Sequence, residues 1–122
     1  ILVLGVREPR LEERNWNVAD LHAFVRAHNG WMALAHPFRY KNIVNFDLTK
    51  YPPDAIEIRS SNIAAEKHKR IEELIGLSGS RTICTSDAHI ASRAGLFYVE
   101  LDIMPADEAD LARMLRAGEF RA

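Results

Sequence analysis

The sequence is poor in cysteine and has no long hydrophobic run. Its one cysteine, Cys84, cannot form a disulfide within the chain. No apolar stretch approaches the roughly 18 residues that a membrane span requires, and no signal peptide is recognisable. We therefore expect no membrane partner, and the cytoplasm is the expected compartment.

The sequence also lacks an excess of charge of either sign. Sixteen basic and 17 acidic residues give a formal net charge of -1, so no strong positive field is available to bind a phosphate backbone. Nucleic acid is therefore not expected as an obligate partner. The 122 residues, of which 48% are hydrophobic and 27% charged, are typical of one soluble domain with one core.

Signature motifs of several common enzyme classes are missing. The chain contains no G-x-x-x-x-G-K, G-x-G-x-x-G, G-x-S-x-G or C-x-x-C. Nucleotide-binding loops, serine hydrolases and zinc ribbons therefore lack their primary indication. The chemistry has to be sought in other residues.

Apolar runs alternate with amphipathic stretches along most of the chain. One helix is expected to begin after Asn17 and stop at Asn29-Gly30, a second to begin at Ser61 or Asn62 and end at Gly76, and a third to begin near Pro105 and end before Gly118. A long loop is expected between Pro37 and Pro53. The expected strands cover residues 1–6, 31–36, 55–60, 81–85 and 96–101.

This alternation predicts βαβ units and an α/β fold with a largely parallel sheet or barrel. Ligand sites in such folds lie at the carboxyl ends of the strands. The strand at 31–36 delivers His36-Pro37, and the strand at 81–85 delivers Asp87 and His89. We therefore expect both groups at one edge of the sheet.

Asp87 and His89 form a D-x-H motif, whose side chains lie on the same side of an extended backbone. Spacing alone leaves two interpretations, the start of a helix capped by Ser86 or Asp87, or a pair of metal ligands. His36 by itself is more typical of a structural histidine. The placement of both groups after predicted strands favours ligands, and imidazole with carboxylate suits zinc, manganese or iron.

Other candidate residues surround these positions. Arg39 and Arg93 are expected at the same edge, where guanidinium groups could bind a phosphorylated substrate or simply be solvated. Glu57, between two isoleucines, must face water or be paired inside, either with a neighbouring strand or beside a ligand. Cys84 is interpreted as a core residue. Three helix histidines are interpreted as surface residues: His22, His28 and His68.

Three blocks, "WMALAHPFR", "PDAIEIRSSN" and "ICTSDAH", in this order and separation, resemble the C-terminal half of the PHP domain, the polymerase and histidinol phosphatase superfamily of metal-dependent phosphoesterases. The resemblance covers about residues 1–120. It implies a distorted (β/α)7 barrel with two or three divalent metal ions, Zn, Mn or Fe, at the carboxyl ends of its strands. It also implies that His36, Asp87 and His89 are metal ligands.

The family's opening H-x-H motif and its bridging glutamate have no counterpart, because no H-x-H occurs in these 122 residues. The chain also opens directly on an apolar run, "ILVLGV". We therefore expect residues 1–122 to be a single partial domain that lacks an N-terminal segment needed to complete the site, and to be inactive or nearly so alone.

The complete protein is expected to hydrolyse a phosphate monoester or diester on a small phosphorylated substrate, with metal-activated water as the attacking group and Arg39 or Arg93 orienting the phosphate. Two alternatives remain open. One is a PHP-fold binding or regulatory module without catalysis. The other is an exonuclease domain associated with a polymerase, which the neutral charge balance disfavours.

Overall fold

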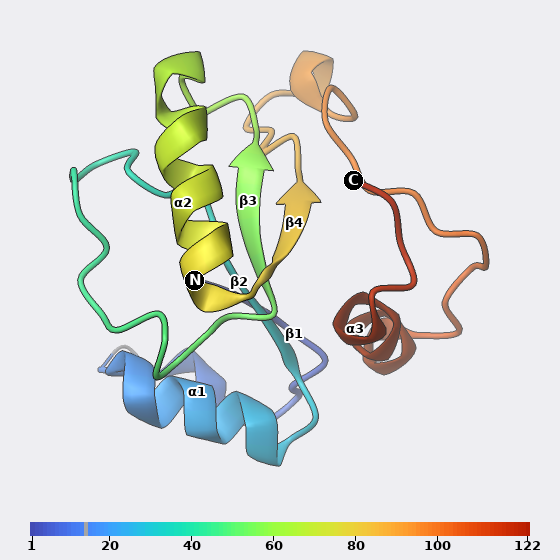
Figure 1. Ribbon diagram of the computed structural model, residues 1–122. Helices are drawn as coiled ribbons and strands as arrows, with labels where there is room; N and C mark the ends of the chain where they lie inside the picture. The colour runs from blue at the N-terminus through green and yellow to red at the C-terminus, as the bar shows by residue number, and fades with distance from the viewer. Residues whose placement is uncertain (14) are drawn as a thin grey trace.

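Four strands form one sheet in the computed structural model, which describes residues 1–13 and 15–122 (Figure 1). The strands follow each other across the sheet in chain order. β2, β3 and β4 are parallel to one another, which confirms the predicted α/β class with a mostly parallel sheet. Their bounds are β1 Leu2–Leu4, β2 Trp31–Leu34, β3 Ala55–Arg59 and β4 Arg81–Cys84.

β1 departs from the parallel arrangement because it pairs with β2 in the antiparallel direction. Leu4 at its end faces Trp31 at the start of β2. The chain between them therefore leaves and re-enters the sheet at the same end. α1, Val18–Ala27, lies across this base of the sheet (Figure 1).

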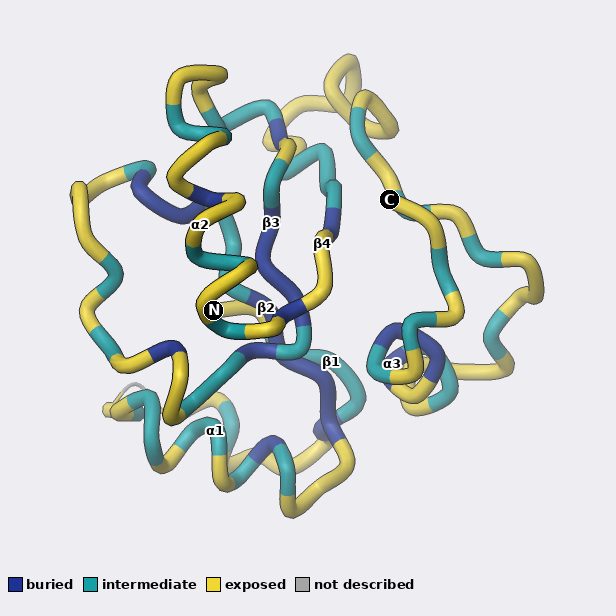
Figure 2. The backbone as a smooth tube through the Cα atoms, in the orientation of Figure 1, coloured by how far each residue is buried: buried dark blue, intermediate teal, exposed yellow. Residues whose placement is uncertain are grey.

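The two faces of the sheet are covered by different helices. Ile56 packs with Ile71 of α2, and Met32 packs with Val25 of α1. The alternate residues Trp31 and Ala55 pack on the other face with α3, Glu108–Ala117. Figure 2 shows that β2 and β3 are the most continuously buried part of the chain. This layering leaves the carboxyl ends of the parallel strands uncovered by helices.

The helix signals are confirmed at two of the three helices. The Asn17 side chain accepts a hydrogen bond of 2.9 Å from the Asp20 backbone, as expected of an N-cap at the start of α1. α3 begins at Glu108, three residues beyond Pro105, because the Asp107 side chain caps it through the backbone N–H of Asp110. The Asp-x-x-Asp spacing decides this start, rather than the proline.

The predicted bounds of the second helix are wrong at both ends. A 3₁₀ turn covers Ala65–Lys67, and α2 runs from His68 to Ser78, so neither Ser61 nor Asn62 caps it. Gly76 lies inside α2, and the helix ends at Gly79, whose φ of 68° is left-handed. Two glycines lie near this helix end, and backbone conformation selects the second.

The predicted fifth strand at 96–101 is also wrong. The only bridge described in this segment joins Glu100 to Arg121, with N–H···O bonds of 2.8 and 2.9 Å. Leu96 and Tyr98 remain exposed, because the segment contacts the C-terminal residues and does not pair with the β4 edge. Further short 3₁₀ turns cover Pro9–Glu12 and Ala91–Arg93. The expected loop at 37–53 is confirmed as a stretch of turns without helix or strand.

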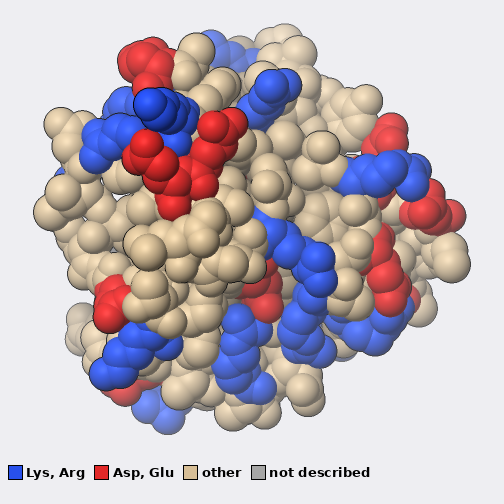
Figure 3. All heavy atoms as spheres, viewed as in Figure 1, with Lys and Arg blue, Asp and Glu red and all other residues tan. Residues whose placement is uncertain are grey.

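The base of the sheet collects the C-terminal ends of the helices and several arginines. Arg81 at the start of β4 donates to the carbonyl of Ala117 at the end of α3 at 3.0 Å. Arg116 donates to the carbonyl of Gly30 after α1 at 3.1 Å. Figure 3 shows basic side chains gathered below the strands. Arg81 thereby satisfies a carbonyl that the end of α3 leaves without a helical partner, and Arg116 connects α3 to the residue before β2. Among the described residues no helix is long and apolar enough to cross a membrane.

The two glycines of α2 give a test of where the helix ends. We expect Gly76→Ala to stabilise the fold by about 1 kcal/mol, because Gly76 is a helix-interior residue with open space around its Cα. Gly79→Ala should destabilise it by about 1 kcal/mol, because an added Cβ is strained at positive φ. Urea unfolding measures both changes. A helix that ended at Gly76 would reverse the two signs.

Candidate functional site

The carboxyl ends of β2 and β4 are joined by one buried carboxylate from the strand between them. Glu57 in β3 is 1% exposed. Its Oε2 accepts a 2.6 Å hydrogen bond from the backbone N–H of His36, and its Oε1 accepts one from the hydroxyl of Thr85. The expectation that Glu57 either faces water or is paired inside is thus resolved in favour of pairing. Glu57 fixes the backbone positions from which the two predicted ligand groups project.

The backbone at this edge adopts conformations that ordinary residues avoid. His36, Phe38 and Asp87 have φ values of +28°, +66° and +42°. Left-handed backbone costs roughly 1–2 kcal/mol for each residue that carries a Cβ. Such strain persists where surrounding contacts enforce it, and it concentrates at functional sites. Two of the three predicted metal ligands, His36 and Asp87, are therefore held in strained positions.

Asp87 is the centre of the polar contacts at this edge. Its Oδ2 accepts a 3.1 Å hydrogen bond from Nη1 of Arg39 and another from the side-chain amide of Asn62. Its Oδ1 lies 3.5 Å from Nε2 of His89. The backbone N–H of Arg39 donates to the carbonyl of His36 at 3.2 Å. The structure thus connects the turn that carries His36 to Asp87 through Arg39.

The donor pair of the D-x-H motif suits a first-row divalent metal. Metal–ligand bonds of about 2.0–2.2 Å in tetrahedral geometry separate two ligand atoms by roughly 3.4 Å, close to the 3.5 Å between Asp87 Oδ1 and His89 Nε2. His89 is largely exposed, so its ring is accessible. These two residues form a fitting pair of adjacent ligands, to which further ligands would have to be added.

His36 does not join this pair in a single cluster. The His36 ring packs edge-to-face with the Tyr40 ring, and the two ring centroids are 5.9 Å apart. Within residues 1–13 and 15–122, no group of three or more metal-binding side chains lies close enough to share one ion. His36 could serve a neighbouring ion at the same edge, as the resemblance implies. That assignment stays a prediction.

The two predicted arginines have different surroundings. Arg39 is half-buried and paired with Asp87, so its guanidinium lies at the site. Arg93 lies in the 3₁₀ turn after His89, exposed, and its side chain makes no hydrogen bond or ion pair with the described residues. The structure brings Arg39 to the site, and a phosphate-orienting role of Arg93 stays a prediction.

Cys84 sits directly before this edge, at the end of β4. Burial raises the pKa of its thiol, and the positive charge of Arg59 opposes that rise. A thiol with a raised pKa is a poor nucleophile at neutral pH. The raised pKa agrees with an unreactive thiol, but Cys84 is only partly buried, so its interpretation as a core residue is not borne out.

Asn62 is the functional residue that the sequence reasoning placed wrongly. Its amide donates to both the side chain and the carbonyl of Asp87, whereas the sequence suggested a helix cap. The position of Ser60-Ser61-Asn62 directly after β3 indicates the same edge, because the carboxyl ends of parallel strands lie together. Residues after β3 are therefore candidates for the site, as are those after β2 and β4.

No protein-family model, curated protein or solved structure matches this chain. The chemistry of the edge therefore has to be argued from its own residues.

Glu57 can be tested directly. We expect Glu57→Ala to lower the free energy of unfolding by about 3 kcal/mol, because it leaves the His36 N–H and the Thr85 hydroxyl without their acceptor. Glu57→Gln should cost about 1 kcal/mol, since the amide keeps one acceptor oxygen. Urea unfolding measures both. Amide hydrogen exchange at His36 should accelerate in Glu57→Ala, and an unchanged rate would contradict the assigned contact.

Proposed function

We propose that the protein is a metal-dependent phosphoesterase, and that this chain supplies one part of its metal site. The observation that carries the proposal is the buried Glu57, which fixes the ends of two parallel strands so that His36 and Asp87 emerge at the same edge. The distance between Asp87 and His89 supports metal binding by the D-x-H pair. The resemblance to the PHP superfamily supports the same reading.

In this proposal the side chains divide the tasks of binding. Asp87 and His89 would hold one divalent ion, and His36 would hold metal at a neighbouring position. A divalent metal ion supplies a lowered pKa for water and neutralises phosphoryl oxygens. Arg39 donates one N–H to Asp87, which leaves other N–H groups of its five for a phosphate. Asn62 keeps the Asp87 carboxylate oriented while Arg39 contacts substrate.

The net reaction adds water across a phosphate ester. The oxygen of water bonds to phosphorus, and the bond between phosphorus and the ester oxygen breaks. One proton of the water passes to the departing alcohol and the other stays with the phosphate. The substrate would be a small phosphorylated molecule, with no obligate nucleic acid partner.

The complete protein would form a distorted (β/α)7 barrel, of which this chain is the C-terminal part, and would act in the cytoplasm. Two or three ions, Zn, Mn or Fe, would require ligands beyond the three that this chain offers. An N-terminal segment with an H-x-H motif and a glutamate would supply them. On this proposal the 122 residues alone are inactive or nearly so.

A binding or regulatory module without catalysis is the second candidate. The observation that favours it is the state of Asp87, whose Oδ2 is already engaged by Arg39 and Asn62. A carboxylate with two donors on one oxygen is stable without a metal. Sequence upstream of Ile1 discriminates the two, because an H-x-H there supports the phosphoesterase and its absence supports the module.

Metal content and hydrolysis of a phosphate ester by the full-length protein test the proposal. We expect His36→Ala and Asp87→Asn each to lower kcat/KM at least about 100-fold and to lower bound metal, because each removes a ligand. His28→Ala is the control, since His28 lies after α1 at the opposite end of the sheet. Full activity and metal content in Asp87→Asn would overturn the assignment.

A further inference from the structure

The loop that follows β2 forms the lining of a surface hollow beside His36 and Arg39. Its volume is about 310 Å³, which lies in the range of pockets for small organic molecules. Most of its wall is apolar. The apolar and aromatic side chains that line it are Leu34, Phe38, Tyr40, Ile43, Val44 and Phe46.

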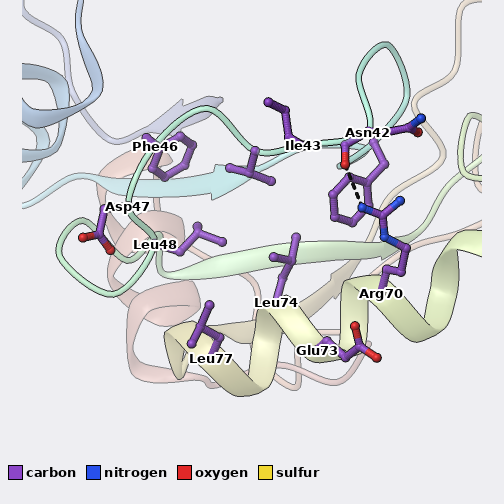
Figure 4. A pocket seen from close by; sticks show the side chains of 11 residues that line it. Asn42, Ile43, Phe46, Asp47, Leu48, Arg70, Glu73, Leu74 and Leu77 are labelled. Atoms are coloured by element: carbon purple, nitrogen blue, oxygen red, sulfur yellow. Dashed lines mark hydrogen bonds between the residues drawn. The ribbon is translucent and has the colours of Figure 1, made fainter.

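The charges of this hollow are suited to an anion. Its described lining includes His36, Arg39 and Lys41 and no carboxylate. A second hollow of about 490 Å³ lies against α2 and shares four lining residues of the same loop (Figure 4), which are Phe38, Ile43, Val44 and Phe46. That hollow is also apolar, but its charged lining, Asp47, Glu73 and Arg70, carries a net negative charge. A phosphate ester therefore fits the hollow at His36 better than the one at α2.

The 3₁₀ turn Ala65–Lys67 and α2 both contact the wall of the hollow. Lys67 donates from Nζ to the carbonyl of Phe38. The guanidinium of Arg70 lies 4.3 Å from the centre of the Phe38 ring and donates to the carbonyl of Asn42 at 2.7 Å (Figure 4). These contacts hold Phe38 and Asn42 in a loop that has no secondary structure of its own.

Two apolar side chains of the hollow remain largely in water. Tyr40 is 78% exposed and Ile43 is 67% exposed. The Tyr40 ring contacts the His36 ring at 5.9 Å and lies 5.0 Å from the Arg39 guanidinium. An apolar group in the hollow would therefore cover exposed apolar surface while its phosphate stayed beside Arg39.

We propose that this hollow binds the organic group of the substrate, and that the substrate is a phosphate monoester of an apolar or aromatic alcohol. This inference rests on the proposed phosphoesterase function. The phosphate lies toward Arg39 and Asp87, and the alcohol group lies along Tyr40 and Ile43. Replacing an apolar lining residue by a polar one should then weaken the binding of substrates with a large organic group more than that of small substrates.

The test compares 2-phenylethyl phosphate with ethyl phosphate in the full-length protein supplied with divalent metal. Their alcohols have similar acidity, so a difference in kcat/KM reports binding of the phenyl group. We expect 2-phenylethyl phosphate to be preferred at least about tenfold. The corresponding phosphonates, which cannot be hydrolysed, report binding alone by calorimetry.

Ile43→Ser should lower the ratio of kcat/KM for 2-phenylethyl phosphate to kcat/KM for ethyl phosphate about tenfold. Ile103→Ser is the matched control, because Ile103 is 72% exposed and lies far along the chain, outside the hollow. Ile103→Ser should leave kcat/KM unchanged for both substrates. Equal effects of the two variants on 2-phenylethyl phosphate would contradict the proposal.

The outcomes separate the two proposals. Hydrolysis of both esters with equal kcat/KM and equal phosphonate affinity overturns the substrate class and leaves the phosphoesterase intact. Absence of hydrolysis with tighter binding of 2-phenylethylphosphonate, lost in Ile43→Ser, overturns the phosphoesterase and leaves the hollow as a binding site. Neither hydrolysis nor phenyl-dependent binding overturns both.

Discussion

The arrangement at the carboxyl ends of the parallel strands depends on the burial of one carboxylate, that of Glu57. Glu57 lies between strands on both sides, so water cannot solvate its charge, and its oxygens must find donors within the protein. The donors that it finds come from the first residues beyond the neighbouring strands, the His36 backbone and the Thr85 hydroxyl. One electrostatic requirement therefore fixes two loops at once.

The parallel arrangement explains why arginines at the two ends of the sheet have different roles. Helix C-termini gather at the base, where Arg81 donates to the carbonyl of Ala117 in the last turn of α3 and Arg116 donates to that of Gly30 beyond α1. These side chains are engaged in holding elements together. Arg39 lies at the opposite edge, where its partner is the carboxylate of Asp87. The same residue type thus bonds to backbone carbonyls at the base and to a carboxylate at the strand ends.

Sequence reasoning succeeded where the determining contacts are local and failed where they are distant. The Asn17 cap and the strands after residues 30, 54 and 80 follow from patterns within a few residues. The direction of β1 depends on where α1 lies, and the segment at 96–101 depends on contacts with the C-terminus. Gly76 and Gly79 both permit a helix end, and only Gly79 adopts the left-handed backbone conformation that ends α2.

The candidate site shows the same division. The D-x-H spacing and the strand ends pointed to Asp87, His89 and His36 from the sequence, whereas Asn62 could be assigned only once the end of β3 was placed beside Asp87.

The two carboxylate oxygens of Asp87 have different contacts. Oδ2 is held by Arg39 and Asn62, so the carboxylate cannot rotate freely, and Oδ1 faces His89. A carboxylate fixed through one oxygen presents the other in a defined direction, which lowers the ordering cost of binding a ligand there. Backbone strain at His36 is offset by the hydrogen bond of its N–H to Glu57, and strain at Asp87 is offset by the bonds of its Oδ2 to Arg39 and Asn62. The contacts at Asp87 also orient its side chain.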